Sequence, residues 1–383
     1  MKKPGHILFI GHEASLSGAP ILLLNLLLLL QQQRSVRITL VIRRGGPLEE
    51  QYRRHFPVIV LKPAGYRQGG PLKKIADILR NRLQLARLFM VMPSCDYVFS
   101  NTIINGPLLK TIAPFGKPVV TYVHELEHVI KAYTAEVAQT VQYTRRFGFP
   151  SLKVKEVLAG ACQLPAEKLQ RLSYYFPVNR EEINNEAAKQ AFVKGFKQRF
   201  GLEDSDMLIG GMGLASDRKG TDIFVEVCGK VAAVNKKIKF CWIGNFDSPA
   251  TEAALKAQVK ALNIEGQVMF TGPLEHNYYN LAPFDLFFLS SREDPYPLVV
   301  LEAGFMQVPT LCFENSGGIP EFVGEDAGWI VPGLSADKAA ASILTLYSQR
   351  EALHAKGARA MQKSLQLHAD GTLILQQFDS LLS

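Results

Sequence analysis

Two adjacent cations in the C-terminal half of the chain could hold an anion. Arg218 and Lys219 follow the apolar, glycine-rich stretch Ile209–Gly213. Neighbouring guanidinium and ammonium groups can neutralise a concentrated negative charge, such as that of a diphosphate, through charge-assisted hydrogen bonds. Taken alone, the same pair would suit an exposed surface loop equally well.

Two acids lie further along the chain and could bind hydroxyl groups. A buried apolar run ends at Ser290, and a proline-containing loop with Asp294 then leads into an apolar helix that contains Glu302. Carboxylates accept hydrogen bonds from vicinal hydroxyls, and the free amides at the start of this helix favour an anion. At ~1.5 Å rise per residue, the two acids are at most about 12 Å apart. That spacing matches a sugar ring and a ribose joined by a diphosphate, although each acid alone could equally be an N-cap or an exposed helical glutamate.

Short apolar runs that alternate with helical stretches must position these groups. This alternation indicates parallel sheets covered on both faces, and ligands of such sheets bind at the carboxyl ends of the strands. The predicted strands fall near 5–10, 36–42, 58–61, 97–99, 119–123, 207–211, 237–243, 268–270, 286–289, 310–313 and 329–331. A further strand-turn-helix unit is expected over 147–158, with Ser151 at its turn.

The repeated pattern predicts an α/β fold with two Rossmann-like domains that face each other across a cleft. Residues 181–200 are polar and helical, and the strand pattern restarts after them. We therefore expect an N-terminal domain over 1–185 and a C-terminal domain over 186–365, both Rossmann-like. A closing helix over 366–383 is expected to pack back on the first domain.

Composition excludes several other classes of protein. Apolar and charged content is ordinary for a globular chain, and the five scattered cysteines form no Cys-x-x-Cys pair, which indicates reduced thiols and no structural zinc. The run Ile21–Leu30 is too short to span a membrane and lacks a cleavage site after it. It is predicted to be a buried helix.

The charge is distributed unevenly along the chain. Residues 1–180 hold 25 Lys and Arg against 10 Asp and Glu, whereas the remaining residues hold 18 against 25. Such a basic half could attract anionic lipid headgroups, an anionic acceptor or nucleic acid. The basic pairs are Arg43–Arg44, Arg53–Arg54, Lys73–Lys74 and Arg145–Arg146.

The order of the motifs resembles a known family. Asp217–Gly220, the stretch 291–304 (SREDPYPLVVLEAG), Pro309 and Ser316–Glu321 together resemble the retaining glycosyltransferases of the two-Rossmann-domain (GT-B) fold, of the glycosyl transferases group 1 or family 4 type. The N-terminal half agrees more weakly, through Ser15–Pro20 and Tyr122–Glu125. The resemblance implies that the domain over 1–185 lies on the acceptor side and that the domain over 186–365 binds the nucleotide sugar.

The resemblance implies a role for individual residues. It places His124, Arg218, Lys219, Asp294 and Glu302 in the catalytic site: the cations hold the donor diphosphate, the acids contact the donor sugar and ribose, and the histidine touches the sugar. Gly18 would approach the diphosphate and sugar. The other expected donor-binding residues are Gly213, Asn245, Thr271, Gly272, Glu293, Pro295, Tyr296, Pro297 and Leu298.

One position departs from the family pattern. The first acid of the pair is often glutamate in the family, whereas here it is Asp294, with Glu293 beside it. Aspartate is one methylene shorter, so the sugar contact could be altered or made by Glu293 instead. The spacing and the proline loop favour Asp294.

The implied reaction is transfer of a sugar from a nucleotide diphosphate sugar to a glycan or lipid-linked acceptor, with retention at the anomeric carbon. Neither a cofactor nor a metal is expected, and Asp204 and Asp206 are interpreted as part of a turn. A nucleotide-sugar epimerase or phosphorylase of the same architecture, or a catalytically silent sugar-nucleotide-binding relative, remains open.

The expected partners are the donor, the acceptor and an anionic membrane with which the chain associates peripherally. Nucleic acid is not expected. These expectations correspond to a cytoplasmic protein at the inner face of the membrane, with a role in polysaccharide biosynthesis.

Overall fold

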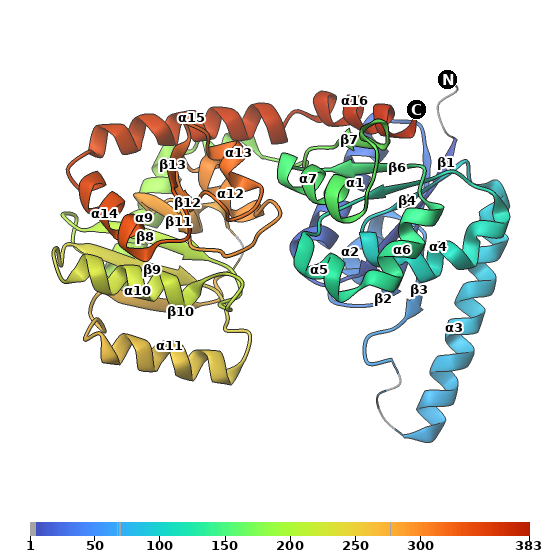
Figure 1. Ribbon diagram of the computed structural model, residues 1–383, viewed down its shortest axis with the longest axis horizontal. Coiled ribbons are helices and arrows are strands. Elements are labelled where there is room, and N and C mark those ends of the chain that lie inside the picture. Colours follow the sequence, from blue (N-terminus) through green and yellow to red (C-terminus); the bar gives the residue numbers. More distant parts are fainter. Residues whose placement is uncertain (1–4, 67, 69, 276) are drawn as a thin grey trace. The chain divides into compact units, whose positions relative to one another are not determined.

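The computed structural model describes residues 5–66, 68, 70–275 and 277–383 (Figure 1). The chain divides into two compact units. The N-terminal unit comprises Met1–Pro177 together with Asp370–Ser383, and the C-terminal unit comprises Val178–Ala369. Each unit contains a parallel sheet with helices packed on it, as the alternating sequence pattern predicts.

The N-terminal unit has a seven-stranded, fully parallel sheet in the order β3-β2-β1-β4-β5-β6-β7. The order reverses between β1 and β4, which makes this the switch point of a doubly wound sheet. The last strand, β7, was not predicted, because three residues are too few to give a strand pattern. The strands are β1 (His6–Glu13), β2 (Arg37–Arg44), β3 (Val58–Lys62), β4 (Tyr97–Ser100), β5 (Val119–Tyr122), β6 (Arg146–Phe149) and β7 (Leu169–Arg171).

The strands of this unit are connected by helices on both sides of the sheet. Ser151 begins α7, as the sequence suggests, and its hydroxyl accepts a hydrogen bond from the amide of Val154. The helices are α1 (Gly18–Gln33), α2 (Glu49–His55), α3 (Pro71–Val91), η1 (Met92–Ser94), η2 (Ile103–Asn105), α4 (Gly106–Ile112), η3 (Ala113–Phe115), α5 (Glu127–Ala132), α6 (Thr134–Tyr143), α7 (Leu152–Ala161), η4 (Ala166–Lys168) and α16 (Gly371–Leu382).

The leucine-rich run forms the buried helix α1. Leucines on nearly all of its faces are buried, and the amide of Asn25 is satisfied by donating to the carbonyl of Tyr175 at 3.2 Å. A helix that is apolar on every face needs cover on every face. Among the described residues, no helix is long and apolar enough to cross a membrane.

The C-terminal unit repeats the same strand order with six parallel strands, β10-β9-β8-β11-β12-β13. Its switch point lies between β8 and β11, which pair through Leu286 and Ile209. The strands are β8 (Met207–Met212), β9 (Ile238–Ile243), β10 (Val268–Gly272), β11 (Leu286–Leu289), β12 (Thr310–Phe313) and β13 (Gly328–Val331).

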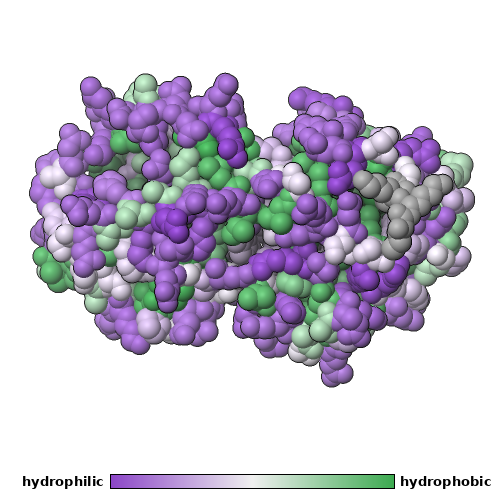
Figure 2. All heavy atoms as spheres, turned by 90° about the horizontal axis from the view of Figure 1, so that it is seen from above, coloured by the Kyte–Doolittle hydropathy of each residue, from purple (hydrophilic) through white to green (hydrophobic). Residues whose placement is uncertain are grey.

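Helices of this unit pack in two groups. Helix α10 packs on α11 and α14, while α12 packs on α15 (Figure 1). The surface on the side of α15 is mostly hydrophilic (Figure 2), because the buried positions of α15 fall along one face. The helices are α8 (Arg180–Ile183), α9 (Glu186–Phe200), α10 (Thr221–Ala232), α11 (Pro249–Ala261), η5 (Tyr278–Leu281), α12 (Leu298–Phe305), α13 (Ile319–Val323), α14 (Ala336–Leu346) and α15 (Arg350–His368).

The sequence predicted the first boundary between the units after residue 185. In the structure it lies after Pro177. Helix α8 belongs to the C-terminal unit because the hydroxyl of Tyr279 donates to the carbonyl of Glu182 at 2.6 Å. This contact could not be predicted from local sequence patterns, since nearly a hundred residues separate its two partners.

The C-terminal segment consists of two helices instead of one helix over 366–383. Helix α15 ends at His368, and Asp370 caps the new helix α16 by accepting from the amide of Thr372. Helix α16 belongs to the N-terminal unit, where the ring of Phe378 packs on Phe9 and Phe99. The start of α16 also touches Leu29 of α1, so α16 provides part of the cover that α1 needs.

Replacing the ring that docks α16 should destabilise the N-terminal unit selectively. Phe378 is fully buried, and we expect Phe378→Ala to lower the free energy of unfolding of this unit by about 3–5 kcal/mol. Both tryptophans, Trp242 and Trp329, lie in the C-terminal unit. The denaturant midpoint measured by circular dichroism should therefore fall in the variant. The midpoint measured by tryptophan fluorescence should stay at the wild-type value.

Leu152→Ala is the matched control for this prediction, because Leu152 is an exposed apolar residue of the same unit. It should leave both transitions near those of the wild type. Equal shifts in the two Phe378→Ala transitions would contradict the selective effect.

Candidate functional site

The loops at the switch point of the C-terminal unit carry the cations and acids singled out in the sequence. One loop follows β8 and contains Gly213, Arg218 and Lys219, and the other follows β11 and leads to Asp294. Both lie at the carboxyl ends of adjacent strands, where ligands of doubly wound sheets bind.

The two loops are tied together at their backbones. Gly220 has a φ of 63°, and a Cβ there would approach the carbonyl oxygen of Ser290 to 2.0 Å, so only glycine fits. The hydroxyl of Ser290 donates to the carbonyl of Lys219 at 3.0 Å. In addition, the amide of Arg292 donates to the carbonyl of Arg218 at 2.9 Å.

A bidentate ion pair holds the second loop against α10. Arg292 donates from Nη1 and Nη2 to the two carboxylate oxygens of Asp222, at 2.7 and 2.6 Å. Fork-to-fork geometry of this kind fixes orientation as well as distance. Arg292 is therefore a positioning residue for the loop, a role that the sequence motif alone did not reveal.

Asp294 lies between the two cations. Its buried carboxylate accepts a short hydrogen bond from Lys219 Nζ and lies 3.6 Å from Arg218 Nη1. The Arg218 side chain is half exposed and also donates to the carbonyl of Glu293 at 2.9 Å. The aspartate thus holds the ammonium group in place, while the guanidinium remains accessible to a ligand.

The backbone of Asp294 is fixed by the loop after β12. Its amide donates to the carbonyl of Ser316 at 2.8 Å, and its carbonyl accepts from the amide of Gly318 at 3.1 Å. Gly317 has a φ of 120°, and a Cβ there would approach the Asp294 carbonyl to 1.8 Å. The sequence Ser316-Gly317-Gly318 therefore allows a close backbone approach that carries Asp294 into the site.

The remaining residues of this motif surround the start of α12. Pro297 is the N-cap, and Leu298 is the first helical residue. The buried hydroxyl of Tyr296 lies 3.1 Å from His368 Nε2 of α15. Pro295 lies in the loop, and Glu302 is half-buried within α12, so Asp294 and Glu302 flank the helix start as the sequence predicted.

The other expected donor-binding residues gather at the ends of β8, β9 and β10. Gly213 has a φ of 134° and lies beside the Lys219 side chain. The amide of Gly244 donates to the carbonyl of Gly272 at 3.0 Å, next to Thr271, and the carbonyl of Asn245 accepts from Ala215 at 2.8 Å. The loops after β8, β9 and β10 are thus in direct contact, which brings this group of predicted residues to one edge of the sheet.

In the N-terminal unit, His124 is buried directly after β5. Its Nε2 lies 3.0 Å from Asn101 Oδ1, and its Nδ1 lies 3.2 Å from the hydroxyl of Tyr174. Asn101 Nδ2 donates to the carbonyl of Ala19, which orients the amide and makes Oδ1 the acceptor. His124 therefore carries its proton on Nε2, and Nδ1 accepts from Tyr174.

Burial keeps the His124 ring neutral. Desolvation, and to a lesser extent the nearby His12, lowers the pKa of His124 to about 3. The neighbouring Glu125 is also buried, which raises the pKa of its carboxyl, and it accepts from the Thr102 hydroxyl and from the amide of His124. Both ring nitrogens of His124 are engaged, so a ligand that bonds to the ring must displace Asn101 or Tyr174.

Gly18 begins α1, and Asn101 links this glycine loop to His124 through Ala19. His12 stands at the end of β1, where burial lowers its pKa and Glu13 opposes that effect. Asn101 and His12 were not predicted. Each lies two positions after a predicted strand (5–10 and 97–99), so the rule that places ligands at carboxyl ends could have identified them.

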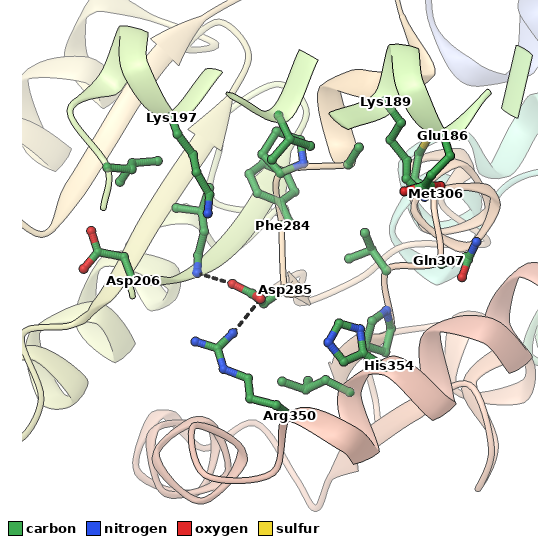
Figure 3. A pocket seen from close by; sticks show the side chains of 18 of the residues that line it. Glu186, Lys189, Lys197, Asp206, Phe284, Asp285, Met306, Gln307, Arg350 and His354 are labelled. Atoms are coloured by element: carbon green, nitrogen blue, oxygen red, sulfur yellow. Dashed lines mark hydrogen bonds and ion pairs between the residues drawn. The ribbon is translucent and has the colours of Figure 1, made fainter. Parts of the chain in front are cut away.

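A separate hollow of about 500 Å³ lies at the amino ends of β8, β11 and β12, on the opposite edge of the C-terminal sheet (Figure 3). Several of its charges are paired: Asp285 accepts from Arg350 at 2.6 Å and from the amide of Leu208 at 2.7 Å, and Lys197 pairs with Asp204 just outside the hollow. Burial raises the pKa of Asp285, and Arg350 partly offsets this. Asp204 and Asp206 lie in and directly after a turn, as predicted.

Comparison with known proteins identifies a family for the C-terminal unit. Residues 194–363 match the model of the glycosyl transferases group 1 family. A processive diacylglycerol alpha-glucosyltransferase of Acholeplasma laidlawii is 28% identical over 125 residues, which are 32% of this chain and 36% of that protein. An alpha-galactosylglucosyldiacylglycerol synthase of Streptococcus pneumoniae is 26% identical over 156 residues, 39% of each protein. The chain thus spans just over a third of the length of these relatives.

The fold extends over nearly the whole chain. The crystal structure of Alr3699/HepE of Anabaena, in complex with UDP and glucose, has a TM-score of 0.78 and 19% identity, and the match covers 98% of this chain and 99% of that one. With the strand order repeated in both units, this likeness establishes the two-Rossmann-domain architecture. Residues 194–363 therefore belong to the glycosyl transferases group 1 family, within a chain that has the GT-B fold.

Proposed function

We propose that the chain is a retaining glycosyltransferase that moves a sugar from a nucleotide diphosphate sugar to a glycan or lipid-linked acceptor. No metal or cofactor takes part. The enzyme acts at the cytoplasmic face of an anionic membrane and contributes to polysaccharide or glycolipid synthesis. The observation that supports this proposal most strongly is the Arg218–Lys219–Asp294 cluster at the switch point of the C-terminal sheet.

The two cations of this cluster, Arg218 and Lys219, suit the negative charge of a departing nucleoside diphosphate. Lys219 is largely shielded from solvent, whereas Arg218 is half exposed, so one cation is fixed and the other can close on a phosphate. Preorganised cations stabilise the charge that develops on a leaving group without reorganising during the reaction. The first amides of α12 lie next to Asp294 in sequence and add partial positive charge.

The acids suit the neutral parts of the donor. Asp294 accepts hydrogen bonds from the sugar hydroxyls through the oxygen that Lys219 leaves free, and Glu302 binds the ribose. The acceptor attacks from the face that the diphosphate leaves, within a tight ion pair, and its proton passes to the departing phosphate oxygen. The anomeric configuration is retained, and no protein nucleophile is required.

A donor panel separates this proposal from its alternatives. The chain is incubated with UDP-, GDP- and ADP-sugars and an acceptor extract, and nucleoside diphosphate release and the product anomer are measured. Acceptor-dependent release with retention supports the proposal. Interconversion of the donor without release would instead indicate an epimerase, and binding without turnover a catalytically silent relative.

Removing the fixed cation should abolish most of the turnover. We expect Lys219→Ala to lower acceptor-dependent nucleoside diphosphate release by at least about 100-fold, the scale of losing one preorganised charge donor. Lys230→Ala is the matched control, because Lys230 also pairs with an aspartate of the same unit, Asp337, at 2.6 Å. Thermal melting of both variants checks folding, and near-normal turnover of Lys219→Ala would remove this role.

His124 should act as a neutral group throughout the working range. Its pKa of about 3 lies far below the ordinary value of 6.5, so the unfolded chain binds a proton in a pH range where the folded chain does not. Its contribution to stability is therefore present above pH 6.5 and is lost as the pH falls toward 3. The limiting slope is about 1.4 kcal/mol per pH unit.

His124→Gln should flatten this dependence. Glutamine stays neutral and can still donate and accept, so the free energy of unfolding of the variant should fall less steeply than that of the wild type as the pH drops below 6.5. Circular dichroism during urea unfolding at several pH values measures the slopes. The exposed His55 of the same unit supplies the control, since His55→Gln should parallel the wild type. Identical slopes for all three proteins would show that His124 is not buried and neutral.

A further inference from the structure

Helix α3 is anchored to the N-terminal unit by one face. Asn81 donates to the carbonyl of Leu61 in β3 at 2.9 Å, and Leu88 is fully buried in the core formed with β4 and α4. Leu85 packs against the same core. In Figure 1, the helix extends beyond the strands of its own unit, at the lower right.

The opposite face of α3 presents an apolar stripe to solvent. Leu72 is 84% exposed, Leu79 60% and Met90 73%, with Ile75 and Leu83 also more than half exposed. At about 100° per residue, these positions and Ala86 fall within an arc of about 80°, centred opposite Asn81 and Leu88. The stripe consists of Leu72, Ile75, Leu79, Leu83, Ala86 and Met90.

Cations flank this stripe without internal partners. The exposed basic residues of α3 form no ion pair with another described residue, and the helix holds a single acid, the buried Asp77. They are Lys73, Lys74, Arg80, Arg82 and Arg87. On the same helical geometry of about 100° per residue, Arg80, Arg87 and Lys73 lie on one side of the stripe and Arg82 on the other, whereas Lys74 falls on the anchored side of the helix.

Most members of the other basic pairs of this unit bond within the unit. Arg43 donates to the carbonyl of Ile104, Arg53 and Arg54 pair with Glu49 and Glu50, and Arg145 and Arg146 bond to carbonyls at the end of α16. Among the described residues of this unit, Arg44 and Lys110 are also exposed without an ion pair, but α3 carries five such cations on one helix.

We propose that α3 is the surface by which the chain docks on an anionic lipid bilayer, with its apolar stripe inserted among the acyl chains and its arginines and lysines at the headgroups. An apolar stripe edged by cations is the pattern of helices that lie in the plane of a membrane interface. Each cation near such a surface raises affinity about fivefold. The proposal rests on the membrane association included in the proposed function and identifies the surface that provides it.

Vesicle flotation tests this docking directly, without donor or acceptor. The full chain is mixed with vesicles of phosphatidylcholine alone, or of equal parts phosphatidylcholine and phosphatidylglycerol. We expect flotation with the anionic vesicles only, weakened by salt. Leu79→Asp combined with Leu83→Asp should lower the bound fraction at least tenfold.

The matched control places the same substitutions on exposed apolar residues elsewhere. Val234→Asp combined with Leu334→Asp, at positions with similar exposure in the C-terminal unit, should float as the wild type does. A second variant keeps the stripe intact: Arg80→Gln with Arg87→Gln should weaken binding about 25-fold, the product of two such cation contributions. Thermal melting verifies that each variant is folded.

Several outcomes would overturn the proposal. These are flotation of the Leu79→Asp, Leu83→Asp variant at the wild-type level, equal binding to both vesicle types, or no flotation of the wild type. Sedimentation velocity without vesicles provides one more: a dimer that this variant abolishes would assign the stripe to a second copy of the chain. Turnover with a water-soluble acceptor is measured separately, so loss of docking and loss of the proposed activity can be told apart.

Discussion

The ion pair between Lys219 and Asp294 is the interaction on which the rest of the C-terminal unit depends. Both groups are largely removed from solvent, and removing one partner of a buried pair typically costs about 3–5 kcal/mol because it leaves an uncompensated charge. The surrounding loops are shaped to make this contact. Gly220 lets one loop approach β11, Gly317 lets another approach Asp294, and Arg292 is clamped to Asp222. The pair thus holds the Lys219 ammonium group at the position where the charge of a donor diphosphate would lie.

The repeated strand order explains why the chemistry-bearing residues lie where they do. In each unit the order reverses next to the first strand, and the loops after the two central strands diverge and leave room for a ligand. In the C-terminal unit these loops carry Lys219 and Asp294, and in the N-terminal unit they carry Gly18 and Asn101. The two sets differ in electrostatic character, since one is ionic and the other, around His124, is neutral because burial disfavours its charged form.

Sequence patterns were sufficient for most elements but not for contacts between distant residues. The predicted strand at 286–289 coincides with β11, because an uninterrupted apolar run bounded by turn residues has few alternatives. The motif identified Lys219 and Asp294 separately, but it could not reveal that they pair, since 75 positions separate them. The position of Asn101 after a predicted strand could have marked it as a candidate, but its bonds to His124 and Ala19 could not be read from the sequence.

Two leucine-rich helices of the N-terminal unit illustrate the limit of composition most clearly. Helix α1 is apolar around its circumference and is covered in part by α16, which returns from the far end of the chain. Helix α3 confines its leucines to two faces, of which one is packed and the other is edged by arginines and lysines. Burying that second face inside the protein would remove those cations from water, at a high cost in free energy. An anionic membrane interface can accommodate both the apolar stripe and the cations beside it. The charges beside the stripe, more than the stripe itself, therefore decide what kind of surface it can meet.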